Sequence, residues 1–146
     1  MRRAIRAGDL LLVCLDGLIA VASVAISFIV RFDLGAALEF MLPQLMAVAC
    51  IALFLKPGVF LAARLYAIYW RYVSPPEVIR LYRATVAASI AFGLAVTILQ
   101  SPFALLRGIP AAVFLVDFLV TALAVSSVRL LLHLRLSRGT QPIRRA

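Results

Sequence analysis

Residues 10–30 read LLLVCLDGLIAVASVAISFIV, an apolar run interrupted by one charged side chain, Asp16. A helix that crosses a lipid bilayer needs about 20 predominantly apolar residues. The run therefore predicts a transmembrane helix. It is longer than the apolar core of a secretory signal peptide, and no small-x-small cleavage site precedes a polar mature chain. We therefore expect this helix to remain in the mature protein.

Three further apolar runs follow the first. They lie at about residues 40–63, 81–99 and 110–134. The chain has 146 residues, of which 65% are hydrophobic, and its mean hydropathy is +1.09, whereas soluble domains are about half apolar. These features predict an all-α membrane protein in which residues 1–146 form one membrane domain, a four-transmembrane-helix bundle. Residues 135–146 are expected to form a flexible basic tail, and Pro57 is expected to bend or end the second helix.

Positive charge is distributed unevenly around these runs. Twelve arginines lie before the first run, between the second and third, or around the end of the fourth, and only Arg31 and Arg107 lie in the other two connections. Cytoplasmic loops of membrane proteins carry the excess of arginine and lysine. We therefore expect a multi-pass membrane protein with both termini cytoplasmic. The net charge of +9 then indicates contact with anionic lipid headgroups rather than with nucleic acid.

The connection between the second and third runs, RLYAIYWRYVSPPEVIRLYRA at 64–84, contains all four tyrosines and the only tryptophan. Such residues favour the headgroup level of a membrane, where arginines reach lipid phosphates. We expect an interfacial belt, with a specific lipid or partner site as the alternative; its members are Tyr66, Tyr69, Trp70, Arg71, Tyr72, Arg80 and Arg83. Ser74 and Glu77 have the spacing of a capping box, which predicts a third helix that starts near Pro75.

Ionisable residues inside the predicted spans need partners, because an unpaired charge in lipid is costly. With a rise of about 1.5 Å per residue, Asp16 and Arg129 lie at similar depths near the cytoplasmic side, together with Lys56. Asp16 is therefore within reach of Arg129 and of Lys56. Asp117 lies in the outer half of the fourth helix, and its expected partner is Arg31. These pairings predict that the first and fourth helices are neighbours.

The sequence contains no recognisable motif of a catalytic or cofactor-binding site. There is no phosphate-binding glycine loop and no serine–histidine–acid set, so we expect no catalytic, cofactor-binding or metal-binding residue. Cys14 and Cys50 are expected to be small packing residues, and His133 an interfacial donor. Small residues on the third helix, such as Ala84 and Ala88 or the row of Ala87, Ala91 and Ala95, suit either a compact bundle or a homo-oligomer seam.

Three stretches carry a resemblance to a known family: DGLIAVASVAISFIVRFD at 16–33, the aromatic-rich segment at 58–84, and IPAAVFLVDFLVTALAVSSVRLLLHL at 109–134. In this order they resemble the N-terminal membrane region of CapD-like polysaccharide-biosynthesis proteins. These are membrane-bound nucleotide-diphosphate-sugar dehydratases and epimerases of O-antigen, capsule and glycan synthesis. The family's aromatic segment reads Gly-Leu-Tyr-x-x-x-Trp-Arg-Tyr. Leu65, Tyr66, Trp70, Arg71 and Tyr72 match it, whereas Ala63 and Arg64 replace the small-residue lead-in.

The resemblance implies an anchor in the bacterial inner membrane that lacks the family's activity. In the family, Rossmann-type domains with the NAD(P) glycine motif follow the membrane region, and the present sequence ends at Ala146, about where they would begin. No catalytic or cofactor-binding position carries over, and we expect a fragment, a split gene or a truncated reading frame. The three stretches are also similar to the membrane region of polyprenyl-phosphate hexose-1-phosphate transferases, so an anchor of such a transferase is an alternative function.

Two other functions are alternatives. One is a small four-helix transporter or flippase with Asp16 as its coupling carboxylate, which requires Asp16 to be unpaired. The other is a structural subunit that recruits a cytoplasmic enzyme through residues 64–84.

Overall fold

The computed structural model describes residues 7–32, 38–67 and 75–138. These residues form four long helices, which are α1 (Ala7–Arg31), α2 (Leu38–Ala62), α3 (Pro75–Leu99) and α4 (Ala111–Arg138), and two short 3-10 helices, η1 (Leu65–Ala67) and η2 (Ala104–Leu106). Each long helix has the length and composition to cross a membrane. The prediction of an all-α protein with four membrane-spanning helices is therefore confirmed.

α2 has nearly the predicted bounds and continues through Pro57 to Ala62, so the proline does not end it, although its ring removes one backbone hydrogen bond from the helix interior. One expectation about the helix ends was wrong. α4 continues to Arg138, so residues 135–138 are helical rather than part of a tail, and residues 139–146 lie outside the described residues. The start of α3 at Pro75 agrees with the predicted position.

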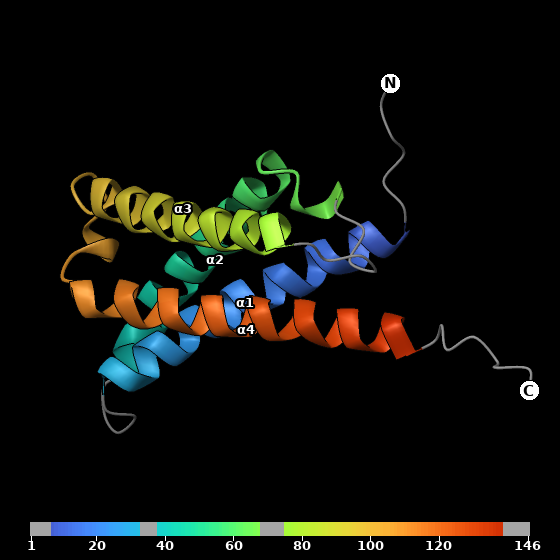
Figure 1. Cartoon of the computed structure of the whole chain (residues 1–146). Helices are drawn as coiled ribbons and strands as arrows, with labels where there is room; N and C mark the ends of the chain where they lie inside the picture. Colours follow the sequence, from blue (N-terminus) through green and yellow to red (C-terminus); the bar gives the residue numbers. More distant parts are fainter. Residues whose placement is uncertain (1–6, 33–37, 68–74, 139–146) are drawn as a thin grey trace, which may run out of the picture.

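The helices form an antiparallel ring in the order α1, α2, α3, α4 (Figure 1). Each helix packs against the two next to it, and α1 packs most extensively, against α2 and α4. One end of the bundle, the η1 end, holds η1 together with the starts of α1 and α3 and the end of α4. The opposite end, the η2 end, holds η2, the end of α1 and the start of α2.

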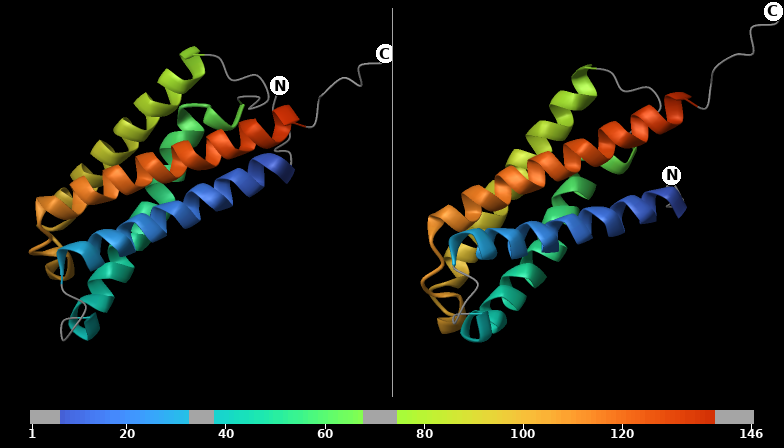
Figure 2. Two further views of the ribbon diagram at one scale, coloured as in Figure 1. Left: turned by 60° about the horizontal axis from the view of Figure 1, so that its bottom comes forward. Right: turned by 90° about the horizontal axis from the view of Figure 1, so that it is seen from below.

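Each long helix buries a row of residues spaced four apart. The rows are Asp16, Ala20, Val24 and Phe28 in α1; Val48, Ala52, Lys56 and Phe60 in α2; Ala84, Ala88, Phe92 and Val96 in α3; and Val113, Asp117, Thr121, Val125 and Arg129 in α4. With 3.6 residues per turn, such a row slants by about 26° across the helix surface. Helices that pack through slanted rows must cross obliquely. Figure 2 shows this for α2, which crosses α1 and α4 at an evident angle.

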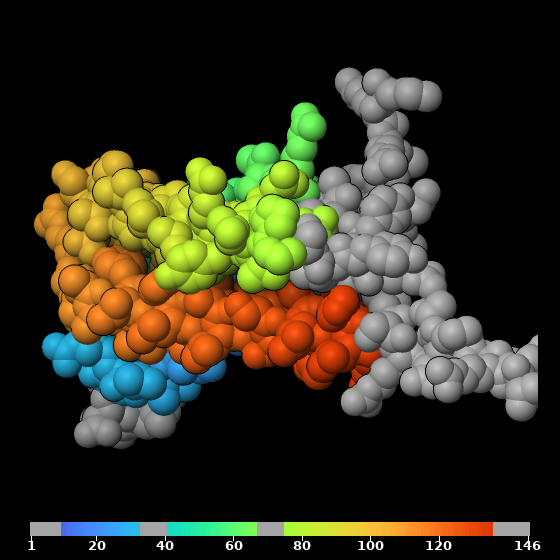
Figure 3. All heavy atoms as spheres, in the orientation of Figure 1, coloured from blue at the N-terminus to red at the C-terminus, as the bar shows by residue number. Residues whose placement is uncertain are grey.

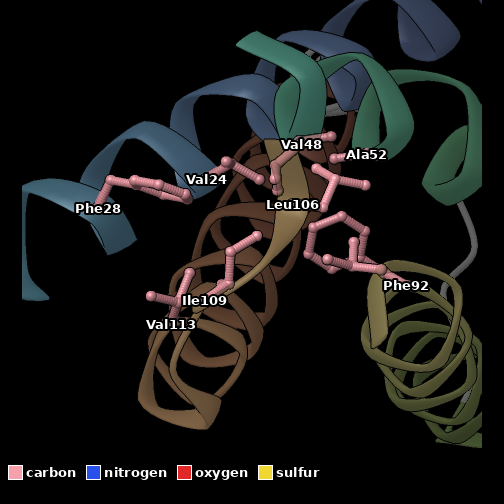
Figure 4. Packing of buried hydrophobic residues seen from close by; sticks show 10 residues of the cluster. Val24, Phe28, Val48, Ala52, Phe92, Leu106, Ile109 and Val113 are labelled. Carbon is pink, nitrogen blue, oxygen red and sulfur yellow. The ribbon is translucent and has the colours of Figure 1, made fainter. Parts of the chain in front are cut away.

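Two apolar clusters fill the inside of the ring. The first lies toward the η2 end, where side chains from α1, α2, α3 and the segment around η2 point toward one another (Figure 4); it includes Val24, Val48, Ala52, Phe92, Leu106 and Ile109. The second lies toward the η1 end and includes Phe60, Leu65, Tyr66, Leu81, Ala88 and Val125. Because lipid is as apolar as these side chains, the clusters hold the helices by close packing rather than by exclusion of water.

Apolar side chains also cover much of the outside. Figure 3 shows the face on which α3 and α4 lie side by side. Exposed residues on these two helices include Ile79, Ile90, Leu94, Ile98, Leu115, Leu119, Leu123 and Leu130. An apolar exterior around spanning helices indicates a bundle that is surrounded by lipid.

An unusual residue conformation ends α2. Arg64 has φ = 55°, in the left-handed region that glycine adopts without steric cost. Its backbone N–H donates to the carbonyl of Leu61 at 3.0 Å. A left-handed residue just past a helix is a common way to end it. The turn at Arg64 directs Leu65 and Tyr66 of η1 into the bundle, where both are buried.

We predict that Arg64→Gly raises the free energy of unfolding by up to about 1 kcal/mol. The left-handed conformation costs a side-chain-bearing residue about 1–2 kcal/mol, and the greater freedom of glycine in the unfolded chain offsets about half of this. The measurement is unfolding of the purified protein in detergent, followed by circular dichroism. Ala62→Gly, two residues earlier at the end of α2, is the control and should gain no stability, because Ala62 already has helical backbone. A loss of stability in Arg64→Gly would contradict the prediction.

Candidate functional site

Two clusters of polar and charged side chains lie inside the bundle. The central cluster consists of Ser23, Lys56, Asp117 and Thr121, all of them buried. The Lys56 ammonium Nζ lies 2.6 and 2.7 Å from the two carboxylate oxygens of Asp117 and 2.8 Å from the Thr121 hydroxyl. Ser23 completes the cluster, because its hydroxyl lies 2.7 Å from Asp117 Oδ1 and 3.2 Å from Lys56 Nζ.

The central cluster connects all four helices. Ser23 comes from α1 and Lys56 from α2, whereas Asp117 and Thr121 are one turn apart on the same face of α4. The Lys56 ammonium also lies 5.0 Å from the ring centroid of Phe92 on α3, within the range of a cation–π contact. α2 and α4 are on opposite sides of the ring and are not packed neighbours. The Lys56 side chain therefore spans the centre of the bundle to reach Asp117.

The hydrogen-bonding capacity of Lys56 is used fully in this cluster. An ammonium group has three N–H donors, and the two oxygens of Asp117 and the Thr121 hydroxyl provide three short acceptors. The side chains of Lys56 and Asp117 are both 1% exposed. Removing two charges from water is costly, and direct pairing with additional hydrogen bonds offsets that cost. The cluster therefore places a neutralised pair, not a free charge, in the spanning region.

The terminal cluster, Asp16, Tyr66 and Arg129, lies closer to the η1 end. Arg129 Nη2 of α4 donates to Asp16 Oδ2 of α1 at 2.6 Å. The Tyr66 hydroxyl of η1 donates to the same oxygen at 2.8 Å, and the Arg129 guanidinium lies 5.6 Å from the Tyr66 ring centroid. Asp16 and Arg129 are each 2% exposed and Tyr66 is 8% exposed. The other carboxylate oxygen of Asp16 has no hydrogen-bond partner among the described residues.

Tyr66 does not lie on the lipid-facing surface, where it was predicted to belong to an interfacial belt. The left-handed turn at Arg64 places its ring inside the bundle instead of at the lipid surface. Burial raises the pKa of the Tyr66 phenol, and the charge of the Asp16 carboxylate beside it raises that pKa further. Of the other predicted belt residues, Arg80 and Arg83 are exposed on α3. The rest lie outside the described residues: Tyr69, Trp70, Arg71 and Tyr72.

The structure brings together some of the predicted charge pairs and not others. Asp16 lies against Arg129, one of the two partners within its reach, and α1 and α4 are packed neighbours as expected. The predicted pair of Asp117 with Arg31 was wrong. Asp117 is level with Ser23 on α1, and Arg31 lies eight residues further along that helix, a rise of about 12 Å. Arg31 is exposed, and Lys56 takes its place.

Other residues singled out in the sequence have no part in either cluster. Cys14 and Cys50 are exposed on the bundle surface rather than packed between helices. Glu77 lies in the first turn of α3, and Ser74, its predicted capping partner, lies outside the described residues. His133 is half-buried near the end of α4. Within the part of the chain that the structure describes, no three histidine, cysteine or acidic side chains are grouped as a metal site would require.

Sequence reasoning missed the neutral members of both clusters. Ser23, Thr121 and Phe92 were not identified, and Tyr66 was assigned to the lipid interface. A signal for Thr121 was present, because it follows Asp117 by four residues and shares its helix face. Ser23 likewise follows Asp16 by seven residues, or two turns.

Comparison with known proteins gives no match. No protein-family model, no curated protein and no solved structure matches this chain.

We predict that Lys56→Met and Asp117→Asn each lower the free energy of unfolding by about 3–5 kcal/mol, because each leaves an unpaired buried charge. The double variant should recover most of that loss, since no charge then remains at the centre. Unfolding in detergent, arranged as a double-mutant cycle, measures the coupling. Arg31→Gln is the control, and its stability should change by less than about 0.5 kcal/mol. Additive losses in the double variant, or a large loss in Arg31→Gln, would contradict the pairing.

We predict that Tyr66→Phe lowers stability at neutral pH by about 1.5–3 kcal/mol, because it removes a hydrogen bond to a buried carboxylate. The pKa of Tyr66 in the folded protein lies above the value of about 10 in the unfolded chain, so the phenol contributes fully below about pH 10 and its contribution declines above it. The gap between the wild type and the variant should therefore narrow as the pH rises past about 10. Unfolding measured at a series of pH values tests this.

The matched control is Tyr82→Phe, because Tyr82 is exposed on α3. It should change stability by less than about 0.5 kcal/mol at every pH. Equal stability of Tyr66→Phe and the wild type at neutral pH would show that the Tyr66 hydroxyl does not support the terminal cluster.

Proposed function

We propose that this chain is the membrane-anchor region of a nucleotide-sugar dehydratase or epimerase type of protein in cell-surface polysaccharide biosynthesis. It has no catalytic role of its own. In this role the bundle holds a cytoplasmic catalytic part at the inner face of the bacterial inner membrane, with both termini of the anchor on that side.

The observation that carries the proposal is the state of Asp16. A carboxylate that couples transport must become accessible from each side of the membrane in turn. Asp16 is instead 2% exposed and is held by Arg129 at 2.6 Å and by Tyr66 at 2.8 Å. Its contacts favour a structural part in joining α1, α4 and η1 over a transport cycle. The same reasoning applies to the Lys56–Asp117 pair, whose side chains are both 1% exposed.

The stretches that carry the family resemblance support the same function. They include Asp16, Tyr66, Asp117 and Arg129, which are members of the two buried clusters. Asp16, Tyr66 and Arg129 join α1, η1 and α4, whereas Lys56, the partner of Asp117, lies outside the three stretches. A membrane anchor needs such contacts whether its catalytic part is a Rossmann-type domain or a sugar-phosphate transferase.

The proposed orientation has support from the bundle geometry. The start of α1 and the end of α4 lie at the η1 end (Figure 1). The arginine-rich segments of the sequence flank these same helix ends, whereas Arg31 and Arg107 flank the helices at the η2 end. By the positive-inside rule, the η1 end faces the cytoplasm.

A paired neutral variant tests the anchor against the transporter. Asp16→Asn combined with Arg129→Gln removes both charges of the terminal cluster together, so no unpaired charge is left in the membrane. If the chain is an anchor, we predict that the double variant stays in the membrane at the wild-type level and that surface polysaccharide is unchanged. Asp16→Asn alone should lower the amount of membrane protein, because it leaves Arg129 unpaired.

The readouts are an immunoblot of the membrane fraction and the quantity of surface polysaccharide in the same cells. Arg135→Gln, an exposed arginine of α4, is the control for loss of positive charge. Normal membrane abundance together with loss of polysaccharide in the double variant would show that the Asp16 carboxylate performs chemistry or transport, and would overturn the anchor function.

A further inference from the structure

A groove opens beside the first turns of α3, at the η1 end. It has a volume of about 600 Å³ and lies between the end of α2 and α3. Its lining residues are Ala63, Pro76, Ile79, Arg80, Arg83, Ala84 and Ala87. The groove is separate from the central and terminal polar clusters, because none of its lining residues belongs to either of them.

Two positive charges stand among apolar walls in this groove. Arg80 and Arg83 are three residues apart, so their side chains lie on neighbouring parts of one helix face. Both are exposed, and among the residues that the structure describes neither forms an ion pair with a carboxylate. Two adjacent guanidinium groups without an acidic partner attract an anion, and the planar donor fork of arginine matches a phosphate group.

The position of the groove along α3 matches the headgroup level of a bilayer. α3 has 25 residues, a length of about 37 Å, whereas the hydrocarbon core is about 30 Å thick. The excess of about 7 Å corresponds to about five residues, so the first turn of α3 can extend past the hydrocarbon boundary. Arg80 and Arg83 lie just after this turn, and their long side chains can reach the headgroup level while their stems stay in apolar surroundings.

We propose that this groove binds one anionic glycerophospholipid. The headgroup phosphate accepts hydrogen bonds from Arg80 and Arg83, and an acyl chain lies against the apolar wall formed by Ile79 and Ala87. A free phosphate ion would satisfy the guanidinium groups but would make no use of that wall. The combination of two cations and an apolar wall thus fits a molecule with an anionic head and an apolar body.

The test is native mass spectrometry of the full chain in neutral detergent, with phosphatidylglycerol and phosphatidylcholine titrated separately. The wild type should retain one phosphatidylglycerol in preference to phosphatidylcholine. Arg80→Gln and Arg83→Gln should each weaken that retention by roughly tenfold, because each removes a charge-assisted contact with the phosphate. Arg135→Gln, at the same end of the bundle but outside the groove, should change it by less than about twofold.

A steric variant separates a built groove from general attraction to positive charge. Ala87→Phe fills the groove and keeps both arginines, so it should abolish the preference for phosphatidylglycerol. Leu94→Phe, an exposed position of α3 outside the groove, should leave it intact. Circular dichroism verifies that each variant is folded, as expected for exposed positions.

Three outcomes would overturn the proposal. The first is that Arg135→Gln weakens the retention of phosphatidylglycerol as much as Arg80→Gln and Arg83→Gln do, which would show a general attraction to positive charge. The second is full retention in Ala87→Phe, which would place the lipid elsewhere. The third is binding of inorganic phosphate that is as tight as binding of phosphatidylglycerol, which would show that the apolar wall contributes nothing. These measurements need no enzyme and no polysaccharide. They can therefore disprove the lipid site without disproving the anchor function, and the polysaccharide assay can disprove the anchor function without disproving the lipid site.

Discussion

The ion pair between Lys56 and Asp117 is the interaction on which the rest of the bundle depends. It joins α2 to α4, which do not pack against each other, and it takes Ser23 of α1 and Phe92 of α3 as further contacts. Apolar packing in lipid has little preference for one arrangement of helices, because lipid competes for every apolar contact. A buried charge pair is different, since almost any other arrangement separates two charges in a medium that solvates neither.

The terminal cluster and the turn at Arg64 extend this constraint to the η1 end. Arg129 and Asp16 join α4 to α1, and the left-handed residue brings Tyr66 onto the same carboxylate. The interior is therefore closed by paired charges at two levels, whereas the groove at Arg80 and Arg83 remains open on the surface. This paired interior supports the proposed anchor function over a path for a substrate.

The four membrane-spanning helices could be predicted from the sequence. Each of the four long apolar runs must form a helix to satisfy its own backbone hydrogen bonds in lipid. The charged members of both clusters were also visible, since each is an ionisable residue within an apolar run. The pairing could not be derived fully from depth. The buried rows slant across each helix, and the flexible stem of Lys56 carries its ammonium to the level of Asp117 on a helix that is not its neighbour. Tyr66 was predicted at the lipid interface because nothing in the local sequence indicates that Arg64 adopts a left-handed conformation. That conformation ends α2 and turns Tyr66 into the bundle.

The start of α1 and the end of α4 lie at the same end of the bundle, which is the arrangement that the proposed anchor function requires. The size of the native protein tests this most directly. Cell membranes would be blotted with an antibody raised against residues 139–146. If the bundle is the anchor region of an enzyme, the band will be several times heavier than the 15.9 kDa of this chain. A single band near 15.9 kDa would mean that the four helices exist as a free-standing protein, and would contradict the proposed function.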